Sequence, residues 1–321
     1  PIKLIPKDAG KDVEALIRIE NGSLEIEDLR WASPEPRPTL PAWLIAAHDA
    51  HVVLRRCELV GPEKATVPYA GVIRFTTAPQ PASEPPTLSV LDSFIQAPGT
   101  LIRAEAGPGT LFVRNSVLAA RGIAIDVRPR AINNDLPFAL DLVQTSIAAT
   151  ESGIQFTAVS LKEPAKLPVQ AFVEGCAFTP PFTIRAGEAT APAVVRLQGP
   201  VLEQQQVAWW GRSNGVSREV RVLLAKGDNI FDPKAWQAAW GEGHDAHLLS
   251  GPDGVVLADH LPVRKEQLKP GSFALHSSCK GVVWAEGRPV GADVRQLDGL
   301  GPQKVADAVP AGGTKKPNTK V

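Results

Sequence analysis

The stretch Val113-Arg114-Asn115-Ser116-Val117-Leu118 decides the fold. It combines a β-prone run, a small residue, one spacer and a bulky apolar residue. Similar stretches recur along the chain, with the small residue, or its degenerate first equivalent, at Leu29, Cys57, Ser93, Ser116, Ser146 and Cys176. The spacings between these positions are 28, 36, 23, 30 and 30 residues. A repeat of roughly 20 to 50 residues built from strands is typical of a solenoid or a propeller.

Each repeat also contains a period-two segment rich in Val, Ile and Phe, such as residues 71–76 and 100–105, which predicts a further strand. A propeller blade needs about 40 residues and four strands, so a 23-residue repeat argues against a propeller. A leucine-rich repeat needs a helical turn for which the prolines leave little room. We therefore predict an all-β fold, a right-handed parallel β-helix solenoid with a short C-terminal capping helix, whose rungs occupy residues 1–225.

Stacking in such a coil predicts columns of equivalent side chains. The small residues point into a narrow interior, so their Ser and Cys side chains are interpreted as packing groups rather than nucleophiles or metal ligands. The main apolar stack lies two residues further on, and we expect it to comprise Trp31, Leu59, Ile95, Leu118, Ala148 and Phe178.

The uneven repeat length has a simple interpretation. Proline-rich, polar insertions at 79–86, 129–137 and 162–168 belong in loops, which a solenoid tolerates. The first two of these are where we expect a binding site to have been added. Residues 226–305 are predicted to form a C-terminal capping segment, and residues 306–321 a disordered tail. The helix of the capping segment should begin at Asp232-Pro233, which suit the N-cap and first helical position, and end near Trp240.

The composition argues against several classes of function and site. Lys plus Arg and Asp plus Glu number 34 each, and this neutral balance argues against nucleic-acid binding. No apolar run approaches the ~20 residues of a membrane-spanning helix. The three cysteines have neither metal-site spacing nor a disulfide framework, so no metal or cofactor is predicted. Because the chain starts at Pro1 and has no Met, we expect it to be a piece of a longer protein.

Two features are candidate ligand-binding sites. Arginines recur at the third place of the first strand, at Arg18, Arg74, Arg103 and Arg196. They form either a basic stripe for carboxylates or sulfates, or cross-rung ion pairs with Glu20 and Glu105. The column is expected to be interrupted at Ile125 and Phe156. Trp209 and Trp210 are adjacent and face opposite ways in a strand. One should pack under the cap, and the other, beside Arg212, is a candidate to stack on a sugar ring.

Catalytic and metal-binding candidates are weaker. Asp126 and Asp141 lie in one repeat, but no ladder of aspartates continues them along neighbouring rungs, so we interpret Asp126 as a solvated or loop-tethering carboxylate. His244 and His247 lie near Asp253 in the sequence, and histidines together with a carboxylate are a ligand set that can hold zinc. Their Gly- and Ser-rich flanks favour a mobile loop instead.

The repeats over residues 15–222 resemble the right-handed parallel β-helix superfamily typified by pectate lyase. The closing elements Asn229-Ile230-Phe231 and Gly291-Ala292-Asp293 are similar to the ends of β-helix domains fused to bacterial serine/threonine protein kinases. The chain departs from that pattern at Ser277-Ser278-Cys279-Lys280. This resemblance implies a sensor or surface-recognition role, extracytoplasmic or at the cell surface, in a larger bacterial protein such as a receptor-type kinase.

The predicted function is a non-catalytic β-helix recognition module for a polysaccharide or a cell-surface protein. Its predicted ligand-binding residues are Arg18, Arg74, Arg103, Trp209, Trp210 and Arg212. The alternatives are a polysaccharide lyase or glycoside hydrolase on the same fold, and a purely structural spacer; the fold alone does not decide between them. An enzyme would need an outward cluster of ionisable side chains from adjacent rungs.

Overall fold

The structure is a computed structural model. It describes residues 2–4, 14–32, 42–61, 70–79, 84–129, 136–158, 169–180, 192–201, 205–217, 219–225, 229–231, 236, 239–241, 244, 248, 254–257, 268–276, 290–297, 299 and 300.

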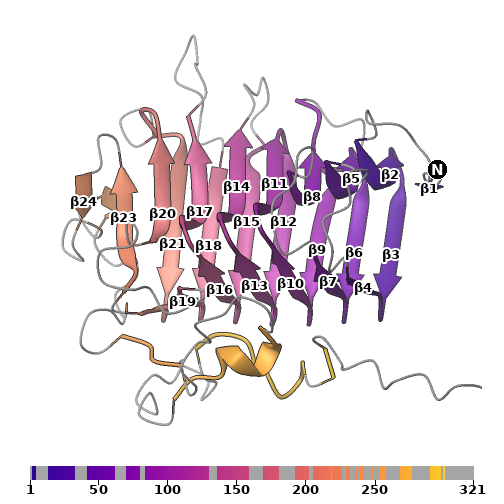
Figure 1. Cartoon of the computed structure of the whole chain (residues 1–321). Coiled ribbons are helices and arrows are strands. Elements are labelled where there is room, and N and C mark those ends of the chain that lie inside the picture. Colours follow the sequence, from indigo (N-terminus) through magenta and orange to yellow (C-terminus); the bar gives the residue numbers. More distant parts are fainter. Residues whose placement is uncertain are drawn as a thin grey trace, which may run out of the picture.

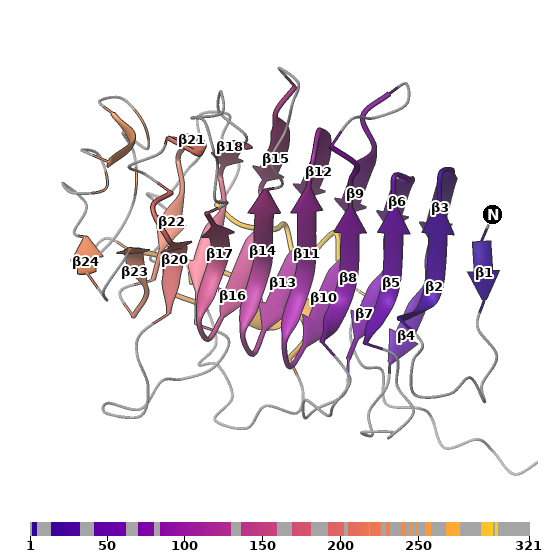
Figure 2. The ribbon, with the colours of Figure 1, turned by 90° about the horizontal axis from the view of Figure 1, so that it is seen from above.

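The chain folds as a parallel β-helix with three sheets (Figures 1 and 2). The first sheet has ten strands: β1 (Ile2–Leu4), β2 (Ala15–Glu20), β5 (Trp43–His48), β8 (Gly71–Thr76), β11 (Thr100–Ala106), β14 (Ile123–Pro129), β17 (Ser152–Thr157), β20 (Ala193–Gln198), β23 (Arg221–Ala225) and β24 (Asn229–Phe231). The second sheet contains β3 (Ser23–Glu27), β6 (His51–Arg55), β9 (Thr87–Leu91), β12 (Gly109–Arg114), β15 (Phe138–Val143), β18 (Val169–Glu174) and β21 (Val207–Arg212). The third contains β4 (Arg30–Ala32), β7 (Glu58–Val60), β10 (Phe94–Ala97), β13 (Val117–Ala120), β16 (Ser146–Ala149), β19 (Ala177–Thr179) and β22 (Gly215–Val216).

The predicted all-β parallel solenoid is therefore confirmed. Each rung runs through the three sheets in turn, and neighbouring rungs pair in parallel. The exceptions lie at the two ends of the first sheet, where β1 and β24 pair antiparallel with β2 and β23. Each of these short strands covers the edge of a strand that would otherwise offer unpaired backbone groups.

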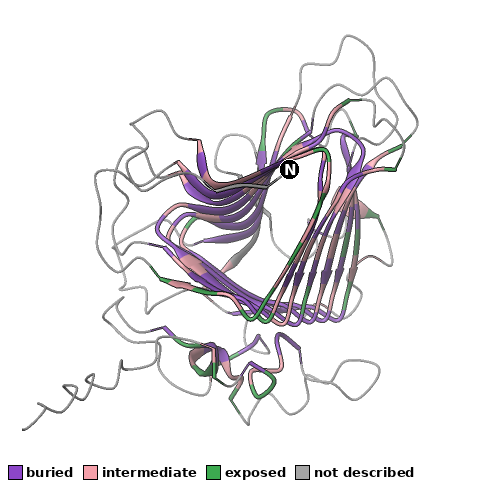
Figure 3. Ribbon diagram, turned by 90° about the vertical axis from the view of Figure 1, so that its right-hand side faces the viewer, coloured by how far each residue is buried: buried purple, intermediate pink, exposed green. Residues whose placement is uncertain are grey.

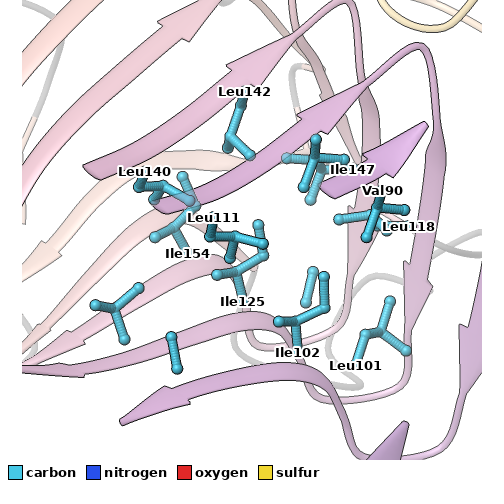
Figure 4. Close-up of a cluster of buried hydrophobic side chains, with 14 of the residues drawn as sticks. Val90, Leu101, Ile102, Leu111, Leu118, Ile125, Leu140, Leu142, Ile147 and Ile154 are labelled. Atoms are coloured by element: carbon cyan, nitrogen blue, oxygen red, sulfur yellow. The ribbon is translucent and has the colours of Figure 1, made fainter. Parts of the chain in front are cut away.

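The core fills the space between the three sheets (Figure 3). Ile102, Leu111 and Leu118 project into it from the first, second and third sheets of one rung (Figure 4). The apolar stack of the third sheet comprises Trp31, Leu59, Ile95, Leu118, Ile147, Phe178 and Val216. Ile147 stands where we expected Ala148.

The turn between the second and third sheets is two residues long in every rung. Its first residue has a positive φ throughout, at Asp28, Arg56, Asp92, Asn115, Gln144, Gly175 and Ser213. Its second residue forms the small-residue column, which is Leu29, Cys57, Ser93, Ser116, Thr145, Cys176 and Asn214. Thr145 replaces the predicted Ser146, because the register pairs Ser146 with Val117 and turns its side chain to the outer face.

Hydrogen bonds between rungs explain why the column is polar and small. The Ser93 Oγ accepts the Cys57 N–H at 3.0 Å, and the Ser116 Oγ accepts the Ser93 N–H at 3.1 Å. The Asn214 Oδ1 accepts the Cys176 N–H at 2.9 Å. Each of these turns thus has a buried donor satisfied by the next rung, so the column is structural, as predicted.

All long connections lead into or out of the first sheet. The connections 33–42, 61–70 and 180–192 lead into it, and 77–86, 130–137, 158–168 and 199–206 lead from it to the second sheet. Apart from Pro129, the last residue of β14, the predicted insertions fall in these connections, and residues 80–83, 130–135 and 162–168 lie outside the described part of the chain.

The C-terminal segment runs along the outer face of the third sheet (Figure 1). Leu268, Phe273 and Leu297 pack on Phe94 and Val117. Gly215 has no side chain at the point where Val255 approaches, and an added Cβ would clash with that valine. This segment was predicted to cap the end of the coil. Its described residues from 255 to 300 instead cover one side.

The end of the coil is closed by tryptophans. Trp236, Ala239 and Trp240 are helical, while the rest of the predicted helix over 232–240 lies outside the described residues. Trp236 is 1% exposed and belongs to the main core. The boundaries predicted at residues 225 and 305 remain predictions, and the predicted tail over 306–321 is not among the described residues.

Candidate functional site

The arginine column lies on the outer face of the first sheet. The register places Arg74 beside Arg103, whereas Ala46 separates Arg74 from Arg18. Asp126 and Gln155 then separate Arg103 from Arg196. We expected Ile125 and Phe156 to interrupt the column, but the interrupting residues are their neighbours Asp126 and Gln155. The side chains of Ile125 and Phe156 point into the core, because a shift of one residue along a strand moves a side chain to the opposite face.

Acidic partners neutralise the arginines of this column. Arg74 contacts Glu14 at 2.8 Å and Glu105 at 2.9 Å, and the Glu105 hydrogen bonds raise the pKa of its guanidinium. The other arginines also have acidic partners: Arg18 pairs with Glu20 and with Glu14 at 3.8 Å, Arg103 with Asp126 at 3.0 Å, and Arg196 with Glu151 at 3.3 Å. A polyanionic ligand would have to compete with these carboxylates.

Asp126 is the centre of this network. Its carboxylate is 0% exposed and accepts hydrogen bonds from Arg103, Arg128 and Gln155. Arg103 also lies over the Trp43 ring, 5.2 Å from its centroid. The first sheet therefore has a cluster of ionisable groups from adjacent rungs, but the cluster consists of internally paired charges. Ligand binding by Arg18, Arg74 and Arg103 stays a prediction.

The two adjacent tryptophans separate as the strand geometry requires. Trp209 is 2% exposed, and its ring lies 5.1 Å from Trp236 and 5.8 Å from Trp240. Trp210 points outward from the second sheet and is 37% exposed. Trp209 therefore lies in the end of the core, and Trp210 is the one that is accessible to a ligand.

Trp210 belongs to a column of outward residues on the second sheet. Phe112, Asp141, Phe172 and Trp210 occupy equivalent positions on β12, β15, β18 and β21, and we call them the aromatic column. Phe172 is 41% exposed and its ring stacks on Trp210, with centroids 4.7 Å apart and planes 8° apart. The centroid separation equals the spacing of neighbouring strands, so both rings lie across the axis of the coil.

Asp141 interrupts the rings with a carboxylate. The structure gives it no hydrogen bond or ion pair with any described residue. Partial burial raises its pKa above the ordinary 3.8, because desolvation disfavours the charged form. Unlike Asp126, this carboxylate makes no hydrogen bond within the part of the chain that the structure describes.

A charged residue borders the aromatic column on the side of the third sheet, and a histidine contacts Trp210. Arg212 lies two residues after Trp210 and contacts Glu174 at 3.7 Å. The His244 ring meets Trp210 edge-on at 6.3 Å. On the opposite side, long connections enter three of the four strands, namely β15, β18 and β21. The predicted ligand-binding residues Trp210 and Arg212 thus lie on one strand of the second sheet. The predicted Arg18, Arg74 and Arg103 lie on the first sheet.

The sequence contains a signal for the residues that were missed. Phe112, Asp141, Phe172 and Trp210 each stand four residues before the small-residue column. Phe112 and Phe172 are separated from Trp210 by whole repeats, so only the correct register of all repeats reveals the column.

Among the described residues, no group of three or more His, Cys, Asp or Glu side chains is placed to hold a metal ion. Of the predicted histidine pair only His244 is described. No helix in the described part of the chain is long and apolar enough to cross a membrane.

No family model, curated protein or solved structure matches the chain.

Proposed function

We propose that the protein is a non-catalytic recognition module that binds a glycan on the outer face of its second sheet. The observation that supports this most directly is the exposed Phe172–Trp210 stack beside Asp141, which has no hydrogen-bond or ion-pair partner among the described residues. Aromatic faces offer an apolar, electron-rich surface for the C–H faces of sugar rings, and charged groups beside them suit the hydroxyls.

The other two faces are less suited to a ligand. The C-terminal segment covers the third sheet, and the first sheet has its arginines paired with carboxylates. In the described part of the chain, only the second sheet combines large exposed aromatic side chains with a carboxylate that has no partner among the described residues. Trp210 also lies on β21, the last strand of its sheet, so one face of its ring points away from Phe172.

We further propose an extracytoplasmic location, in a larger bacterial protein such as a receptor-type serine/threonine kinase. This rests on the resemblance of the closing elements to kinase-associated β-helix domains. In the fold, the Gly291-Ala292-Asp293 element fastens the C-terminal segment: the Ala292 N–H donates to Ser146 Oγ at 3.0 Å. The adjoining gene sequence and cell fractionation test the location.

A glycan array followed by titration calorimetry tests the binding. We expect the wild type to retain a specific glycan, and Trp210→Ala to weaken its binding by about tenfold or more, as for a central aromatic contact. The double variant Arg74→Ala/Arg103→Ala serves as the comparison for the first sheet and should bind as the wild type does.

Two outcomes contradict the proposed site. An array without any retained glycan would refute glycan recognition. Loss of binding in the arginine double variant, with Trp210→Ala unchanged, would move the site to the first sheet, where the arginine column was predicted.

A further inference from the structure

The aromatic column places a carboxylate between two phenylalanines, and we call the position above this carboxylate the slot. Phe112 and Phe172 lie one strand to either side of Asp141, in register with it. Parallel strands are about 4.8 Å apart, so the Cα atoms of the two phenylalanines are separated by roughly 9.6 Å. The Asp141 side chain leaves the sheet between them.

The Phe172 ring presents a face to this slot. Its plane is nearly parallel to that of Trp210, which covers the face on the β21 side. The opposite face is therefore directed along the axis of the coil, towards β15 and Asp141. A group held above Asp141 would lie about 4.8 Å from this ring, within the ~6 Å range of a cation–π contact.

The charges around the slot favour a cation. Asp141 has no partner among the described residues, and Val143, its neighbour two residues on, is apolar. Glu174 on the next strand contacts Arg212, while Arg114 on the preceding strand makes no ion pair with Asp141. A partly buried, unpaired carboxylate beside an aromatic face is the arrangement that holds ammonium groups.

We propose that the slot between Phe112 and Phe172 binds the protonated amino group of an amino sugar, with Asp141 as its counter-ion. The inference rests on the proposed glycan recognition, and it specifies the substrate class as a glycan with free amino groups. The same glycan would extend along the coil towards the Phe172–Trp210 stack, one to two strands further on. This continuity of exposed ring surface favours a sugar chain over an isolated lysine side chain.

The test compares three probes by titration calorimetry: a β-1,4-linked glucosamine hexamer, the matching N-acetylglucosamine hexamer, and tetralysine. We expect the wild type to bind the glucosamine hexamer at least about tenfold more tightly than the acetylated one, since acetylation removes the charge. Asp141→Asn should abolish this preference and leave the weaker binding of the acetylated hexamer unchanged.

Glu25→Gln is the matched control. Glu25 occupies the same outward column on β3, but its in-register neighbour is Val53 and no ring flanks it. The variant should keep the wild-type preference. Far-ultraviolet circular dichroism and melting curves show whether each variant is folded.

The outcomes separate this inference from the proposed function. Equal binding of both hexamers, unaffected by Asp141→Asn, overturns the amino-sugar inference and leaves glycan recognition standing. Absence of binding to any glycan, on the array as well as with the hexamers, overturns both. If tetralysine binds in an Asp141-dependent manner while neither hexamer does, the slot takes its ammonium group from a peptide and the amino-sugar inference is wrong.

Discussion

At the scale of single residues, Asp126 and Asp141 are two aspartates of one repeat whose burial and hydrogen bonding differ. Asp126 is buried and accepts hydrogen bonds from Arg103 and Gln155 on the two neighbouring rungs and from Arg128 on its own strand. Asp141 is partly buried beside aromatic rings and has no such partners among the described residues. The first is a structural carboxylate, whereas the charged form of the second is disfavoured by desolvation.

Removing the Asp141 charge should therefore stabilise the protein. Its pKa is raised above 3.8, so the folded state holds the proton more firmly than the unfolded state. The stabilising contribution of protonated Asp141 to the free energy of unfolding is fully present below pH 3.8, and it is lost as the pH rises through the raised pKa. Asp141→Asn should be more stable than wild type at pH 7, by about 1 kcal/mol or less because of solvent screening, with the gain fading towards pH 4.

Urea denaturation at the two pH values measures this difference, with Glu25→Gln as the exposed control. A variant that is less stable than wild type at pH 7 would show that Asp141 has a stabilising partner in solution.

At the scale of elements, the C-terminal segment is fastened to the third sheet by the turn before β13. The Asn115 Oδ1 accepts the Asp293 N–H at 2.8 Å, and its Nδ2 donates to Gln296 Oε1 at 3.3 Å. Asn115 has a φ of 44°, a conformation that glycine adopts without strain. Asn115→Gly thus removes the side-chain contacts while sparing the turn.

We expect Asn115→Gly to increase amide hydrogen exchange over residues 290–297, with a loss of about 1–3 kcal/mol in the free energy of unfolding of that segment. Arg56→Gly, at the equivalent position of an earlier turn, should leave exchange in the segment unchanged. Equal protection in both variants would mean that the remaining contacts, namely apolar packing and the Ala292–Ser146 hydrogen bond, hold the segment without Asn115.

The sequence predicted the elements better than their register. Repeated β-prone runs between prolines and glycines were enough to order the strands, because each repeat contributes the same strands to the coil. The repeats were misaligned by one residue where adjacent residues have similar sizes: Thr145 and Ser146 both suit the small-residue column, and only interstrand pairing distinguishes them. A similar shift of one residue placed Ile125 in the arginine column, where the structure has Asp126.

The candidate site was predictable in part. Alternation along a strand showed that Trp209 and Trp210 face opposite ways, and the structure buries Trp209. The aromatic column was missed because its members lie a repeat apart and are not identical. A glutamate, a valine and a serine occupy its earlier positions, at Glu25, Val53 and Ser89, so no residue type marks it.

At the scale of the whole molecule, the three sheets have different surroundings. The C-terminal segment covers the third, ion pairs cross-link the rungs of the first, and the second keeps exposed rings. All three share one continuous core, which extends from Ile19 to Trp236. The end of that core and the candidate binding surface meet at β21, through Trp209 and Trp210.

This shared strand predicts opposite consequences for two tryptophans. Trp236→Ala opens the end of the core beneath Trp209, and we expect it to cost about 3–5 kcal/mol in the free energy of unfolding. Trp210→Ala removes an exposed ring and its stack on Phe172, which should cost only about 1 kcal/mol. Urea denaturation of both variants measures the difference.

Glycan binding should show the reverse order, because the Trp236 side chain is buried away from the ligand surface. Trp236→Ala, assayed at a temperature where it remains folded, should bind as wild type does, whereas Trp210→Ala should not. If the two substitutions reduced stability equally, Trp210 would be part of the fold's end cap rather than a ligand contact. The surface of the second sheet would then have to be interpreted as structural.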